Sequence, residues 1–123
     1  MNIALWIVQA LLAVVFSMAG AMKLAQPKEK MAERMAFVED LTEGQLRAIG
    51  VLEILGAIGL ILPALAGILP WLTPLAAAGL VLTMIGAMVV HVRRNEYSNL
   101  VVNLVLLALA AFVAYGRFVV VPL

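Results

Sequence analysis

One acidic residue, Glu53, lies well inside a long apolar segment of the sequence. An ionised carboxylate at such a position in a membrane costs at least about 2.5–3.5 kcal/mol, so it must be neutral, paired with a cation, or in contact with water. His91, the single histidine, ends another apolar segment at a similar expected depth. A Glu–His pair on facing helices could relay a proton or hydrogen-bond the carbonyl group of a quinone or a lipid-like molecule.

Four further polar residues are expected at the depth of Glu53: Lys23, Arg47, Asn99 and Asn103. All of them are candidate ligand-binding or proton-relay residues together with Glu53 and the histidine. Two interpretations remain open. The cluster either binds a ligand or moves a proton, or it is a structural polar cluster in which Lys23 or Arg47 neutralises the carboxylate.

Composition argues against several other chemistries. The sequence has no cysteine, which excludes disulfides, thiol chemistry and Cys-ligated iron–sulfur clusters. One histidine and one buried glutamate do not supply the three or four ligands of a metal centre, and we expect neither a metal nor haem. The net charge of +1, without a basic stripe, gives no field for nucleic acid. No nucleotide-binding or Ser-His-Asp motif is present, so the sequence names no cofactor and no reaction.

The elements that carry these residues are four apolar stretches, each about as long as a helix that crosses a hydrocarbon core of ~30 Å. They account for a content of 66% hydrophobic and 12% charged residues. We therefore predict an all-α, polytopic membrane protein, a four-transmembrane-helix bundle in one domain over residues 1–123. The apolar stretches are Ile3–Met22, Ala48–Leu69, Leu72–Val92 and Leu100–Val121, and the expected spans are about 3–22, 45–69, 73–92 and 99–121.

Charge placement predicts the orientation in the membrane. Seven of the eight basic residues fall in the connections 23–47 and 93–99, and Arg117 is the exception. Basic connections stay in the cytoplasm, so both termini are expected on the periplasmic side. Trp6 and Trp71 would then lie, with Phe118, at the same outer interface.

The first connection predicts a short cytoplasmic amphipathic helix over about 27–40. Met31, Met35 and Val38 recur there at helical spacing, with charged residues on the other faces. This segment would lie along the inner membrane surface or cap the bundle.

Local motifs predict how the spans begin and end. Thr42 and Gln45 fit a capping box at the start of the second span. We expect that helix to continue, with a kink, beyond Pro63. Thr73 followed by Pro74 fits an N-cap and a first helical position for the third span.

Small residues recur every three or four positions in each span. In lipid such residues let helix backbones approach closely, and we expect them to be packing sites. They are Ala13/Ser17/Gly20, Gly56/Gly59, Gly79/Thr83/Gly86 and Ala110/Ala114.

Taken in order along the chain, the polar residues and their neighbours resemble the DoxX-like family of small four-helix bacterial membrane proteins. The resemblance covers nearly the whole chain in length and span number, and four segments carry it: Gly20–Leu24, Gly50–Leu60, Gly86–His91 and Arg93–Glu96.

The resemblance implies a multi-pass protein of the bacterial inner membrane and draws attention to Lys23, Glu53 and His91. The family takes its name from a subunit of an archaeal thiosulfate:quinone oxidoreductase, and other members are linked to redox or stress functions. The leading hypothesis is an accessory protein that binds a quinone or another isoprenoid or lipid-like ligand near the inner-leaflet cluster and supports a membrane redox or stress-response complex. Its expected partners are membrane lipid, quinone, a redox partner protein and further copies of the chain. The alternative is a structural scaffold without ligand chemistry, and a transporter is disfavoured because the outer half offers no polar path.

Overall fold

The structure is a computed structural model, which describes residues 1–34, 41–69, 71–120 and 122. Within this part, four helices are long and apolar enough to cross a membrane, which confirms the prediction of an all-α four-helix membrane bundle. When η2 is counted with α5, the ends of the long helices fall within three residues of the expected spans. The helices are α1 (Asn2–Ala25), α2 (Lys28–Arg34), α3 (Glu43–Ala66), α4 (Leu72–Arg93) and α5 (Tyr97–Tyr115), which is followed by the π-helix η2 (Gly116–Val120).

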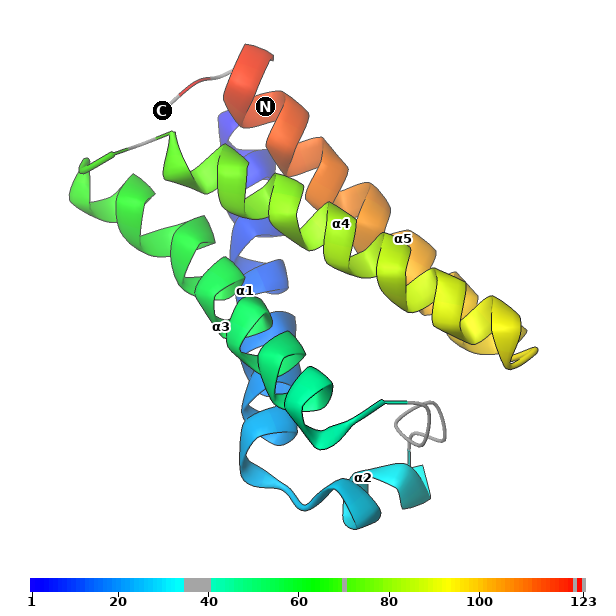
Figure 1. The fold of residues 1–123 in the computed structure, drawn as a ribbon. Helices are drawn as coiled ribbons and strands as arrows, with labels where there is room; N and C mark the ends of the chain where they lie inside the picture. The colour runs from blue at the N-terminus through cyan, green and yellow to red at the C-terminus, as the bar shows by residue number, and fades with distance from the viewer. Residues whose placement is uncertain (35–40, 70, 121, 123) are drawn as a thin grey trace.

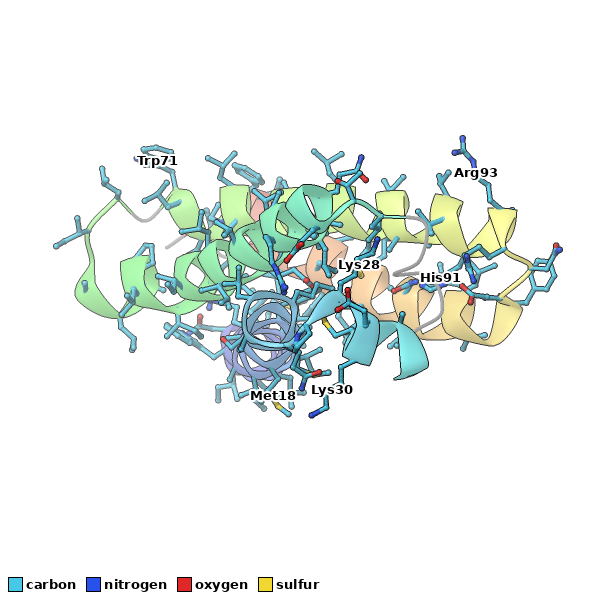
Figure 2. The ribbon with its side chains drawn as sticks, turned by 60° about the horizontal axis from the view of Figure 1, so that its bottom comes forward. Met18, Lys28, Lys30, Trp71, His91 and Arg93 are labelled. Atoms are coloured by element: carbon cyan, nitrogen blue, oxygen red, sulfur yellow. The ribbon has the colours of Figure 1, made fainter. Side chains whose placement is uncertain are left out.

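Figure 1 shows how the long helices are arranged. Both termini lie at the same end of the molecule as the α3–α4 turn, and we call this the terminal end. The opposite end carries α2 and the α4–α5 turn, and we call it the α2 end. The helices form two pairs, because α1 packs mainly on α3 and α4 mainly on α5, while α3 and α4 join the pairs. In Figures 1 and 2 the two pairs lie apart at the α2 end.

Glycines set the closest helix contacts. A Cβ atom at Gly20 of α1 would lie 2.7 Å from the carbonyl oxygen of Gly50 on α3, and one at Gly56 would lie 2.7 Å from a methyl group of Leu80 on α4. Only a residue without a side chain allows the backbones to approach this closely. The apolar core forms around these contacts, and its most buried members include Leu12, Phe16, Leu60, Leu80 and Val113.

The small-residue stripe of α4 does not pack as the sequence predicted. A Cβ atom at Gly79 or at Gly86 would meet no atom of another residue within 4 Å, and the Thr83 hydroxyl donates to the Gly79 carbonyl of its own helix. The reason is that α4 packs through a different face, which includes Leu80 and Met84. Gly79 and Gly86 are therefore not points of close contact with another described helix.

The α3 helix continues past Pro63 and ends at Ala66, where Gly67 adopts the left-handed conformation with φ of 67°. Because proline has no N–H, the carbonyl of Gly59 four residues earlier loses its helical donor. The Thr73 hydroxyl of α4 donates to this carbonyl at 2.9 Å. A side chain from the next helix thus supplies the missing hydrogen bond, as such sites in membranes require.

This contact corrects the role predicted for Thr73. The helix α4 begins at Leu72, with Trp71 at the N-cap position, so Thr73 already lies inside the first turn. Its hydroxyl therefore bonds across to α3 instead of capping its own helix. The capping box of α3 is confirmed, since Gln45 N–H donates to the Thr42 hydroxyl and the Gln45 side chain accepts from the Thr42 N–H.

The short helix α2 lies in the first part of the predicted amphipathic segment, whose residues 35–40 are outside the described structure. Its Met31 is fully buried and packs against Leu46 near the start of α3. This contact fixes α2 to the end of the α1–α3 pair. Met35 and Val38 lie outside the described residues.

Replacing Thr73 tests the bond to the Gly59 carbonyl. We expect Thr73→Val to lower the free energy of unfolding by about 1–3 kcal/mol, because a buried carbonyl loses its donor. In a Pro63→Ala background, where position 63 regains a backbone N–H, the same substitution should cost much less. Equilibrium unfolding in mixed detergent micelles measures both values, and Thr83→Val, which removes only an exposed hydroxyl, is the control. Equal losses in the two backgrounds would contradict this assignment.

Candidate functional site

The buried acid of the sequence is paired with a cation. The Lys23 ammonium of α1 lies 2.8 Å from the Glu53 Oε1 of α3, and the two residues are 8% and 3% exposed. At this separation the two side chains attract each other as opposite charges and lie within hydrogen-bond distance. The packing of Gly20 against Gly50 brings the two helices together beside it. The contact neutralises Glu53, as one of the two interpretations of the sequence predicted.

Arg47 has a different role from the one considered for it. Its guanidinium donates to the backbone carbonyls of Lys23 and, at 2.7 Å, of Gln26, and it also reaches the Glu43 carboxylate at 3.3 Å. Carbonyls at the C-terminal end of a helix lack helical donors, and a cation there is favoured by the helix dipole. Arg47 therefore connects the start of α3 to the end of α1. The cation paired with Glu53 is Lys23.

His91 is bonded at the α4–α5 turn. Its Nδ1 lies 3.0 Å from the Glu96 Oε1, and the other carboxylate oxygen lies 3.4 Å from the Arg94 Nε. The backbone N–H of Glu96 also donates to the His91 carbonyl. Figure 2 shows His91 near the end of α4, next to this turn. These contacts hold the turn together.

The six candidate residues therefore fall into separate contacts. Glu53 is paired with Lys23, whereas His91 is bonded to Glu96, and a site shared by Glu53 and His91 stays a prediction. Asn103 is buried on α5, and within the described residues its amide Nδ2 has no hydrogen-bond partner. The side chain of Asn99 lies outside the described part of the structure.

A second polar cluster, which the sequence analysis did not assemble, lies at the terminal end. Arg117 of η2 is 2% exposed and donates from Nε to Gln9 and from Nη1 to Asn2, both at 2.8 Å. Its guanidinium carbon lies 5.6 Å from the centre of the Trp6 ring. The Gln9 amide in turn donates to the Leu60 carbonyl of α3 at 2.6 Å. We call Asn2, Trp6, Gln9 and Arg117 the terminal cluster.

The sequence carried a signal for this cluster. Gln9 and Arg117 are strongly polar residues in the otherwise apolar halves of the first and fourth spans that lie toward the terminal end. Polar side chains in lipid face the protein interior and pair with one another. Matching the two residues by depth would have predicted their hydrogen bond.

The structure also contains an apolar groove of about 740 Å³ between α3 and α4. Its lining runs from Leu52 to Pro63 on α3 and from Leu72 to Thr83 on α4, with Gly79 among the lining residues. The volume is within the range of small-molecule sites, about 300–1,000 Å³. The Lys23–Glu53 pair lies on the side of α3 that faces α1, so the groove and the ion pair use different faces of that helix.

Comparison with known families agrees with this architecture. The family model described as the DoxX-like family matches residues 7–113. The chain belongs to the DoxX-like family. The matched range includes the Lys23–Glu53 pair, His91 and all residues that line the groove. No curated protein and no solved structure gave a match.

The chemistry open to this DoxX-like chain follows from these contacts. The described residues hold no group of three or more His, Cys, Asp or Glu side chains that could bind a metal ion. The Lys23 ammonium and the Glu53 carboxylate contact each other, so each charge is matched within the chain itself. The groove offers apolar contact over the length of several helical turns. Binding of an apolar molecule is thus the activity best matched by the geometry.

Substitution at Glu53 tests the ion pair. We expect Glu53→Ala to cost about 3–5 kcal/mol of stability, because it leaves a buried ammonium without its counter-charge. Glu53→Gln should cost less, since it keeps the volume and an oxygen near Lys23. The double change Lys23→Met with Glu53→Leu should recover much of the loss, because both charges are then absent. Detergent unfolding curves give these values, and equal small losses for the two single variants would show that Glu53 contacts water.

Proposed function

We propose that this chain is a small membrane accessory protein that binds an isoprenoid or other lipid-like ligand, with quinone as a candidate. The observation that carries the proposal is the groove of about 740 Å³ between α3 and α4. Apolar side chains make up nearly all of its lining, and they complement an isoprenoid or acyl chain. Membership of the DoxX-like family supports a role beside a membrane redox or stress-response complex.

The groove leaves the α4 backbone open at Gly79, whereas Gly56 and Gly59 of α3 are packed against Leu80 and Ala76 of α4. Gly56 and Gly59 lie on its α3 side and Gly79 on its α4 side. At Gly79 no atom of another residue lies within 4 Å of where a Cβ would be, so this space is open to a ligand. Glu53 and Lys23, on the face of α3 that packs against α1, would hold α3, one wall of the groove, in place.

A structural scaffold is the second candidate, and one observation favours it. The stripe of Gly79, Thr83 and Gly86 is a small-residue face of the kind on which transmembrane helices associate. In that case α4 would pack on a second copy of the chain, and the protein would act through assembly. The two candidates use α4 differently, because Gly79 lines the groove whereas Gly86 does not.

We further propose that the α2 end faces the cytoplasm of a bacterial inner membrane. The basic residues near that end, among them Lys28, Lys30 and Arg93, support this orientation. Figure 2 shows Lys28 and Lys30 on α2 and Arg93 at the end of α4. Both termini would then be periplasmic.

The matched pair Gly79→Leu and Gly86→Leu separates ligand binding from assembly. A Cβ atom at either position would meet no atom of another helix within 4 Å, so the two substitutions begin from comparable space. We expect Gly79→Leu to fill the groove and abolish co-purification of the ligand, whereas Gly86→Leu should retain it. Native mass spectrometry of the purified protein, followed by analysis of the released lipids and quinones, measures the effect.

Other outcomes of this experiment would contradict ligand binding. If both substitutions reduce an oligomer to monomers and leave the lipid content unchanged, the stripe is an assembly face and the scaffold is the correct function. If Gly79→Leu and Gly86→Leu lower the lipid content equally, the bound lipid does not occupy the groove.

The orientation predicts the behaviour of C-terminal fusions. Alkaline phosphatase, which is active only in the periplasm, should be active when fused to the C-terminus, and green fluorescent protein fused there after Sec export should be dark. The reason is that basic connections resist translocation and keep the α2 end inside. Fusions of the same reporters within the α4–α5 turn serve as the control and should give the opposite pattern. A fluorescent C-terminal fusion would contradict the orientation.

A further inference from the structure

The position of the groove along the helices limits how a ligand can lie in it. On α4 the lining begins at Leu72, the first residue of the helix, and ends at Thr83, near its middle. On α3 it extends over residues 52–63, which at ~1.5 Å per residue is roughly 16 Å. That is about half of a hydrocarbon core of ~30 Å. The groove therefore belongs to one leaflet, the leaflet on the side of the terminal end.

The mid-membrane end of the groove has no hydrogen-bond donor to offer. Of the described residues that line it, Thr83 alone carries a polar side chain, and its hydroxyl already donates to the Gly79 carbonyl at 3.0 Å. The other lining residues at that end, such as Leu52 and Leu82, are apolar. A quinone carbonyl or a charged head placed there would lose its hydrogen bonds with water, and it could gain one from the lining only if Thr83 gave up its bond to Gly79.

The opposite end of the groove reaches the α3–α4 turn. Trp71, directly before the first lining residue of α4, is 55% exposed, and Figure 2 shows it and His91 at opposite ends of α4. Tryptophan at such a position is typical of the interface between hydrocarbon and water. A polar head at this turn would keep its contact with water while its chain enters the groove.

We propose that the groove holds one acyl chain of a phospholipid from the leaflet on the terminal side, with the head at the Trp71 turn and the chain end near Thr83. This inference rests on the proposed function and narrows it. The ligand is a lipid whose charged head stays hydrated, and a quinone with its ring at mid-membrane is excluded. The bound chain runs from Leu72 along Gly79 toward Leu52.

Photo-crosslinking in vesicles tests the direction of the chain. The protein is reconstituted with phosphatidylcholine that carries a diazirine either at the end of one acyl chain or next to the glycerol, and the labelled residues are identified by tandem mass spectrometry. We expect the chain-end probe to label Leu52, Leu82 or Thr83, and the glycerol-proximal probe to label Leu62, Leu72 or Trp71. Parallel samples contain a quinone with a diazirine next to the ring.

The Gly79→Leu and Gly86→Leu variants show which labels come from the groove. Labelling of Leu52 and Thr83 by the chain-end probe should fall to background in Gly79→Leu and persist in Gly86→Leu. If wild-type labelling depends on Gly79 but the quinone ring probe marks Thr83, or the two phospholipid probes exchange positions, the inferred direction is wrong and ligand binding stands. If no labelling depends on Gly79, the groove binds no lipid and the proposed function fails with it.

Discussion

Polar groups inside the membrane-spanning helices must find their partners within the protein, because hydrocarbon offers them no hydrogen bonds. Much of this structure follows from that constraint. Pro63 deprives the Gly59 carbonyl of its donor, and Thr73 of the next helix replaces it. The charge of Glu53 is matched by Lys23 on α1, and the buried guanidinium of Arg117 is bonded to Asn2 and Gln9. Each of these contacts joins two helices, so satisfying a polar group also fixes the position of a helix.

The fold could be predicted from the sequence to a large extent. Hydrophobic length alone gives the four spans, since a helix must be about twenty residues long to cross the membrane. The capping box at Thr42 depends on residues three apart and was therefore visible as well. The prediction for the α4 stripe was wrong. Gly79 and Gly86 allow another helix to approach closely, but tertiary packing decides whether one does. The same limitation applies to Thr73, whose hydroxyl could accept from an N–H of its own helix as an N-cap or donate to the Gly59 carbonyl of α3.

The candidate site was predictable in its residues and less so in their pairing. That Glu53 requires a counter-charge follows from the cost of burying a carboxylate, and Lys23 was among the expected partners. The partner of His91 is Glu96, five residues away at the helix turn. His91 was grouped with Glu53 by its depth in the membrane, and depth alone does not predict such a local contact. The groove could not be foreseen, because it arises from the angle between α3 and α4 and from where glycines leave space.

The distribution of these polar contacts also has a mechanical consequence. At the terminal end, hydrogen bonds connect the two helix pairs, from Thr73 to Gly59 and from Arg117 to Gln9. At the α2 end, Lys23 is paired with Glu53 within one helix pair, and His91 is bonded to Glu96 within the other. These two hydrogen bonds would restrain motion of one pair relative to the other at the terminal end. Such motion would change the separation of the pairs most at the α2 end and least beside the groove.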